Sequence, residues 1–179
     1  MHKKILFIVY HYLIYKLIIF IRFCALIIAK GMITNMKIAV IDAQGAGLGQ
    51  NIIKRIRREI ENDVYIIALG TNSFATSKMV QAGANVGISG EKAICSFCKT
   101  NKIDGIIGPI GIICSGGING EITSMISNAI FNMDCTKYIL PLQKHGIYIP
   151  GTRNLQIKDI IKEILLDIKG HILESDIKI

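Results

Sequence analysis

Three glycines alternate with other residues at Gly45, Gly47 and Gly49, between a short apolar run and a segment with helical periodicity. Glycine has no Cβ atom, so the main chain at these positions can approach a ligand closely and adopt a positive φ. A helix that begins near Gly47 would direct its free N–H groups and its positive dipole end toward the same space. The spacing therefore predicts a loop that binds a phosphate or another anion through backbone amides. The candidate ligand-binding residues are Gly45, Gly47, Leu48 and Gly49.

The glycine loop matches the known nucleotide fingerprints in part. A G-x-G-x-x-G that starts at Gly45 requires glycine or alanine where Gln50 stands. The alternative spacing G-x-x-x-G-x-G suits Gly47 and Gly49, but it places Ala43 at its first glycine. No G-x-x-x-x-G-K-[ST] occurs, which argues against a P-loop NTPase. A tight turn with close strand–helix packing is the alternative role of these glycines.

A dinucleotide site also needs a group that binds the ribose. An acidic residue about twenty positions after the glycines usually accepts a hydrogen bond from the ribose hydroxyl of NAD. Here the second apolar run ends in Gly70-Thr71-Asn72, so Asn72 is the candidate ribose ligand. NAD or NADP is the first guess for a cofactor. The far side of the cleft is expected at the turn that contains Gly108, Pro109 and Gly111.

Two carboxylates are the polar candidates for a reaction. Asp42 directly follows the first apolar run, and Glu121 opens a segment with helical periodicity. As a pair they could act as acid and base on a small phosphorylated or carboxylate substrate. Each also has a structural interpretation: Asp42 as a turn residue that accepts local N–H groups, Glu121 as a charge that favours a helix start. His145 is interpreted as a surface turn residue.

Other catalytic and metal motifs are missing from the sequence. A Tyr-x-x-x-Lys pair occurs only at Tyr12 and Lys16, ahead of the first strand, and is a coincidence. Neither G-x-S-x-G nor H-E-x-x-H is present. Cys95 and Cys98 form a C-x-x-C, but they lie within an expected helix and have no second pair, so we interpret them as small apolar residues. No metal site is predicted.

The chain from residue 36 onward alternates short apolar runs with helical periodicity. Strands that alternate with helices at this interval pair in parallel through right-handed crossovers. The pattern predicts an α/β protein with a three-layer, Rossmann-like, doubly wound and mostly parallel sheet of five to six strands. Strands are expected at 37–42, 64–69, 85–87, 104–108 and 137–142, with 146–149 as a sixth, and helices at 47–61, 73–81, 91–100, 121–132 and 155–171.

Charge is distributed unevenly along the chain. Of its formal charge of +8, residues 1–35 contribute +5 from five basic side chains with no acidic one. Residues 36–179 hold 16 basic and 13 acidic side chains, a balance of +3. That balance provides no basic footprint of the kind that nucleic-acid binding requires. An odd set of five cysteines fits a reducing compartment, so a cytoplasmic location is expected.

The first 35 residues form a separate region, an N-terminal extension ahead of a nucleotide-binding domain at 36–179. Residues 5–29 are long enough to span a bilayer, but Lys16 and Arg22 offset most of the insertion energy of the apolar side chains. A membrane anchor is therefore marginal. Because the domain pattern begins at Met36, we hypothesise that Met36 is the true start and that the extension is a mis-assigned upstream region.

Several segments after residue 36 resemble one bacterial family. They are MKIAVIDAQGAGLGQNI, ALGTNSFATSKMVQAGAN, GEKAI, DGIIGPIGI and GEIT, which agree in order and spacing with the family catalogued as domain of unknown function 3842. Its members typically read D-G-Q-G-G-G-I-G at the first loop, so Ala43 and Ala46 replace glycines here. The resemblance implies a Rossmann-like fold and a nucleotide-type ligand, and it implies no particular reaction.

These observations predict a cytoplasmic Rossmann-like protein whose partner is a small phosphorylated ligand and not a nucleic acid. The alternatives are a small enzyme that uses Asp42 and Glu121, and a sensor or scaffold without catalysis. A membrane-anchored form requires that residues 5–29 are genuinely expressed. Since 36–179 leaves no room for a separate substrate domain, chemistry would use the cleft itself or a second copy of the chain in a homo-oligomer.

Overall fold

The computed structural model describes residues 15–21, 36–60, 63–142 and 147–177. The chain divides into two units, Met1–Thr34 and Asn35–Ile179, and each is considered by itself. In the first unit, residues 15–21 form a helix whose side chains are exposed. Within the part of the chain that the structure describes, no helix is both long and apolar enough to cross a bilayer.

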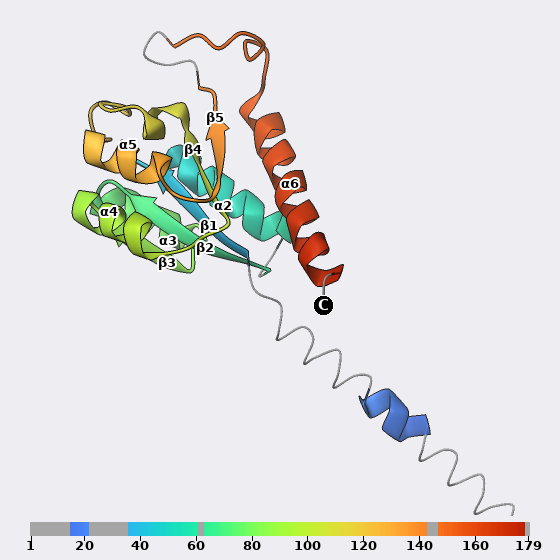
Figure 1. Ribbon diagram of the computed structural model, residues 1–179. Coiled ribbons are helices and arrows are strands. Elements are labelled where there is room, and N and C mark those ends of the chain that lie inside the picture. Colours follow the sequence, from blue (N-terminus) through green and yellow to red (C-terminus); the bar gives the residue numbers. More distant parts are fainter. Residues whose placement is uncertain (1–14, 22–35, 61–62, 143–146, 178–179) are drawn as a thin grey trace, which may run out of the picture. The chain divides into compact units, whose positions relative to one another are not determined.

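The second unit is built on one parallel sheet (Figure 1). Its strands are ordered β3-β2-β1-β4-β5, so the first strand is central and the chain winds outward from it in both directions. Met36 pairs with Val64 on one side of the central strand, and Ile38 pairs with Gly105 on the other. The strands are β1 (Met36–Asp42), β2 (Val64–Gly70), β3 (Val86–Ser89), β4 (Gly105–Pro109) and β5 (Thr136–Leu140).

Helices connect the strands and cover both faces of the sheet. Parallel strands need such crossovers, because the chain must return to the same end of the sheet before each new strand begins. The fold is therefore a three-layer, Rossmann-like α/β arrangement, as the alternation of strands and helices predicted. The helices are α2 (Gly47–Ile60), α3 (Ser73–Gln81), α4 (Glu91–Thr100), the short 3₁₀ helix η1 (Ile110–Ile113), α5 (Ser124–Phe131) and α6 (Ile157–Ile177).

Two apolar cores lie on opposite faces of the sheet. Side chains alternate along β1, so that Ile38 and Val40 enter one core while Ala39 and Ile41 enter the other. Helices α2, α3 and α6 complete the first core, and α4, α5 and η1 complete the second. Figure 1 shows α4 and α5 together on one side of the sheet. Burial on both faces explains why the central strands are almost continuously apolar.

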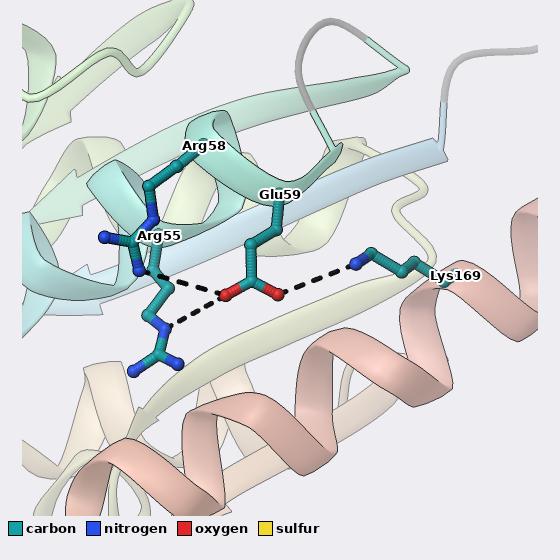
Figure 2. A network of polar contacts seen from close by, with 4 residues as sticks. All are labelled: Arg55, Arg58, Glu59 and Lys169. Atoms are coloured by element: carbon teal, nitrogen blue, oxygen red, sulfur yellow. Dashed lines mark hydrogen bonds and ion pairs between the residues drawn. The ribbon is translucent and has the colours of Figure 1, made fainter.

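Helix α6 joins the first core through apolar and charged contacts. Ile161, Leu165 and Ile168 are at most 1% exposed. At the edge of this contact, Glu59 of α2 forms ion pairs with Arg55 at 3.1 Å and with Lys169 of α6 at 3.6 Å (Figure 2). The pKa of Glu59 lies below its ordinary value, and the hydrogen bond from Arg55 is the largest cause. The positive charges of Arg55 and Lys169 lower the pKa further, and together these effects outweigh the opposing effect of burial.

The structure corrects the predicted bounds of α5 and α6 and the expected sixth strand. Helix α6 runs from Ile157 to Ile177, so it begins two residues after the predicted start at 155 and extends six residues past the predicted end at 171. Helix α5 begins at Ser124 and not at Glu121, because Thr123 caps it by accepting a hydrogen bond from the Ile126 N–H. The residues before it form a loop closed by a bridge between Gly117 and Ile122. The expected sixth strand at 146–149 is not formed at 147–149, which belong to no regular element, and Gly146 lies outside the described residues.

Candidate functional site

A cavity of about 430 Å³ opens at the carboxyl ends of β1 and β4. These neighbouring strands mark the point where the strand order reverses, since the chain moves from β1 to β2 on one side and reaches β4 on the other. Ligands of open α/β sheets bind at this position. We use the name β1–α2 loop for residues 42–49, from the end of β1 into the first turn of α2. The cavity walls are residues 42–48 of this loop, residues 109–111 and 114–119 at and after the end of β4, and Leu142 and Ile147.

The three glycines of the β1–α2 loop have different surroundings. A Cβ atom on Gly49 would lie 2.5 Å from the Met79 sulfur and 3.0 Å from the Asp42 Cβ, so Gly49 is required for packing between strand and helices. A Cβ atom on Gly45 or Gly47 would meet no protein atom within 4 Å. Neither of these two glycines has a positive φ. The described fold therefore does not itself require glycine at positions 45 and 47.

The left-handed backbone occurs at residues with side chains instead. Among the residues that the structure describes, four non-glycine residues have positive φ values, and all four line the cavity: Gln44 at 51°, Ala46 at 51°, Ile118 at 49° and Asn119 at 56°. For a β-branched residue such as Ile118 this conformation is a genuine outlier. Backbone strain of this kind concentrates at functional sites, because selection keeps it where geometry matters.

Asp42 stabilises the loop from inside the protein. It is 7% exposed, and its two carboxylate oxygens each accept a backbone hydrogen bond of 2.8 Å, from Ala43 and from Gly49. The second bond satisfies one of the N–H groups that the first turn of α2 leaves without an intrahelical partner. Asp42 also belongs to the cavity wall. The structure thus combines the two roles considered for this residue, a local turn acceptor and a neighbour of the cavity.

Other amides of the loop remain open to a ligand. Within the described residues, the N–H groups of Gly45, Gly47 and Leu48 have no protein hydrogen-bond acceptor, and all three residues line the cavity. Gly47 and Leu48 are the first residues of α2, where the helix dipole adds positive potential. The junction is therefore closed by the protein at Gly49 and open at these three amides.

Glu121 lies on the other side of the loop and outside the cavity wall. Its carboxylate accepts hydrogen bonds from the Gln44 N–H at 3.1 Å, from the Asn72 side-chain amide at 2.9 Å and from the Thr71 hydroxyl. Burial raises the pKa of Glu121, but these hydrogen bonds outweigh burial and hold the pKa below its ordinary value. Glu121 therefore links the ends of β1 and β2 to the segment that precedes α5.

Asn72, the predicted ribose ligand, is engaged within the protein. Its side-chain oxygen caps α3 by accepting a 2.8 Å hydrogen bond from the Ala75 N–H. Its amide group donates to Glu121 and, at 3.4 Å, to the Gln44 carbonyl. Asn72 is not part of the cavity wall. The structure thus places it beside the glycine loop, on the β2 side.

The predicted far side of the cleft is only partly in the cavity. Pro109 and Gly111 line it, whereas Gly108 does not. A Cβ atom on Gly108 would lie 3.0 Å from the Ile41 carbonyl oxygen and 2.9 Å from the Ile112 side chain, so this glycine serves close packing between β4 and its neighbours. The segment after β5 from Gln143 to His145, also expected near the ligand, lies outside the described residues.

Sequence reasoning missed the segment at residues 114–119. It supplies six consecutive residues of the cavity wall, including Cys114, Ser115 and Asn119. This segment folds back on η1 so closely that a Cβ atom on Gly117 would lie 2.0 Å from the Gly111 carbonyl oxygen. The glycines in CSGGING, between a strand and a helix, were the available signal. The signal was concealed because the predicted helix was begun too early, at Glu121.

The cavity has little formal charge among its described wall residues. Asp42 is the one carboxylic acid among the described wall residues, and these residues include no Lys, Arg or His. No cluster of three or more His, Cys, Asp or Glu side chains suited to a metal occurs within the described ranges. Among the described wall residues, the groups suited to an anion are backbone amides at the start of α2, and Ile110 and Ile118 provide apolar surface.

The chain belongs to the protein family described as domain of unknown function 3842. The family model matches residues 37–172. The matched range covers all five strands apart from Met36, the first residue of β1, and it covers α6 as far as Ile172. This confirms the family resemblance of the sequence motifs. No curated protein and no solved structure matches the chain.

Proposed function

We propose that this protein binds a nucleotide or dinucleotide, with its phosphate at the amides of Gly45, Gly47 and Leu48. NAD or NADP is the first dinucleotide to test. The main supporting observation is that positions 45 and 47 are glycine although neither the backbone conformation nor the packing of the protein excludes a side chain there. Close approach of a ligand to the main chain explains both positions. Three open amides beside a cavity at the strand-order reversal support the same assignment.

Several features favour ligand binding over carboxylate catalysis as the role of this site. Both Asp42 oxygens accept backbone N–H groups, and the Glu121 carboxylate accepts three donors while lying outside the cavity wall. The pKa of Glu121 is held below its ordinary value, so this carboxylate stays ionised and is a weak base at neutral pH. We therefore assign Asp42 and Glu121 to shaping the loop. The proposed partner is a small phosphorylated molecule in the cytoplasm rather than a nucleic acid.

A thermal-shift panel with the full chain tests the proposal. The ligands are NAD, NADP, ATP, a sugar phosphate and CoA. A ligand at a hundredfold excess over its Kd stabilises the folded state by about 2.7 kcal/mol, or roughly 5–10 °C for a domain of this size. We expect at least one phosphorylated compound to produce such a shift. If none of them changes the melting temperature, the proposed function is wrong.

A substitution within the loop locates the response. The Gly47→Val side chain would project into space that the protein leaves empty, so the variant is expected to fold and to lose the shift. Circular dichroism and the ligand-free melting temperature establish that the variant is folded. Retention of the full shift by a folded Gly47→Val protein would place the ligand elsewhere on the molecule.

A further inference from the structure

The cavity extends to only one side of the glycine loop. Its wall runs from the β1–α2 loop toward η1 and residues 114–119, on the β4 side of the sheet. The residues that follow β2, Thr71 and Asn72, contribute nothing to the described wall. In a dinucleotide site the second nucleotide extends over the end of β2, where its ribose is bound.

The β2 side is closed by hydrogen bonds within the protein. On this side the Glu121 carboxylate accepts hydrogen bonds from three donors, which are the Gln44 N–H, the Thr71 hydroxyl and the Asn72 side-chain amide. A ribose at the end of β2 would have to displace this carboxylate and leave it to find other donors. Removing a partner from a buried or half-buried charged hydrogen bond is costly.

We infer that the ligand is a compact phosphate ester no larger than a nucleoside monophosphate, bound between the β1–α2 loop and residues 114–119. This inference rests on the proposed function and narrows it. The phosphate takes the open amides at the start of α2, and the remainder of the ligand lies toward η1. There the wall offers apolar Ile110 and Ile118 for a base or another flat group, and polar Ser115 and Asn119 for hydroxyl groups. A volume of about 430 Å³ lies within the range of small-molecule sites.

Titration calorimetry of the full chain with NAD and its two halves, AMP and nicotinamide mononucleotide, tests the inference. If the protein binds only one nucleotide half, we expect the Kd of the tighter-binding half to lie within threefold of the Kd of NAD. If NAD binds at least threefold more tightly than both halves, the second nucleotide is bound too, and the inference is overturned while the proposed function stands. If none of these probes binds and the thermal-shift panel is also negative, both the inference and the proposed function fail.

A matched pair of serine variants locates the bound half. Ser115 lies in the cavity wall, and Ser73 is the first residue of α3, beyond the end of β2; both are exposed. We expect Ser115→Trp to weaken binding of the tighter-binding half at least tenfold. Ser73→Trp should change the affinity for the same compound less than threefold. Any other outcome in the two folded variants, such as a tenfold loss with Ser73→Trp, overturns the inference. Exposure of both positions favours folding, which the melting temperature of each variant reports.

Discussion

Gly47 and Gly49 are two residues apart in one loop, yet a side chain would meet different surroundings at each. We predict that Gly49→Ala lowers the free energy of unfolding by about 1–3 kcal/mol, because its Cβ atom would overlap Met79. Gly47→Ala should change it by less than about 1 kcal/mol, since the Cβ atom meets no protein atom within 4 Å. Urea denaturation measures both. Equal losses in the two variants would show that Gly47 also has a packing role.

At this scale the sequence could identify the loop but not the role of each residue in it. Alternating glycines after an apolar run marked the strand–helix junction at 45–49. Which glycine packs and which faces open space depends on Met79, 30 positions after Gly49. The partners of Glu121 at Gln44 and Thr71 are likewise distant in sequence. Such contacts arise from tertiary packing, which local spacing does not encode.

Among the elements, α6 shows most clearly how one buried stripe fixes a helix to the sheet. Leu165 is 1% exposed within the first core, and its neighbour Leu166 is 59% exposed. We predict that Leu165→Ala lowers the free energy of unfolding by about 2–5 kcal/mol, through lost burial and a cavity. Leu166→Ala should stay within about 0.5 kcal/mol. Chemical denaturation of the pair is the measurement, and a loss at Leu166 as large as at Leu165 would contradict this packing.

Element types were largely predictable because each strand is a short apolar run and each helix has a polar face. Helix α4 at Glu91–Thr100 and α3 at Ser73–Gln81 have the predicted bounds. The start of α5 was wrong, since Thr123 provides a capping oxygen that competes with helical continuation from Glu121. The cavity wall at 114–119 lies just before that start, so one misplaced boundary concealed a third of the site.

For the whole molecule, the hydrogen-bonded carboxylates couple stability to pH. Burial raises the pKa of Glu121, but hydrogen bonds from Thr71, Asn72 and Gln44 lower it overall, so ionised Glu121 favours the folded state. Its contribution is complete above the unfolded pKa of about 4.3 and is lost as pH falls through the lower folded value. We predict a stability that is steady between about pH 7 and 5 and then declines with further acidification.

The Glu121→Gln variant isolates this contribution. Glutamine cannot ionise, so the variant should be less stable than the native chain near pH 7, and the difference between the two should shrink as pH falls below about 4. Urea denaturation at a series of pH values measures the difference. A gap that stays constant, or one that widens in acid, would show that ionised Glu121 does not stabilise the fold.

The central claim concerns three backbone amides that the protein leaves open at the start of α2. Amide chemical shifts of the ¹⁵N-labelled full chain during titration with AMP test it most directly. The account predicts large, saturable shifts at Gly45, Gly47 and Leu48, and smaller ones at Gly49, whose N–H already donates to Asp42. Saturable binding that leaves the first three amides unmoved, or no binding of AMP or any other phosphorylated compound, would contradict the account.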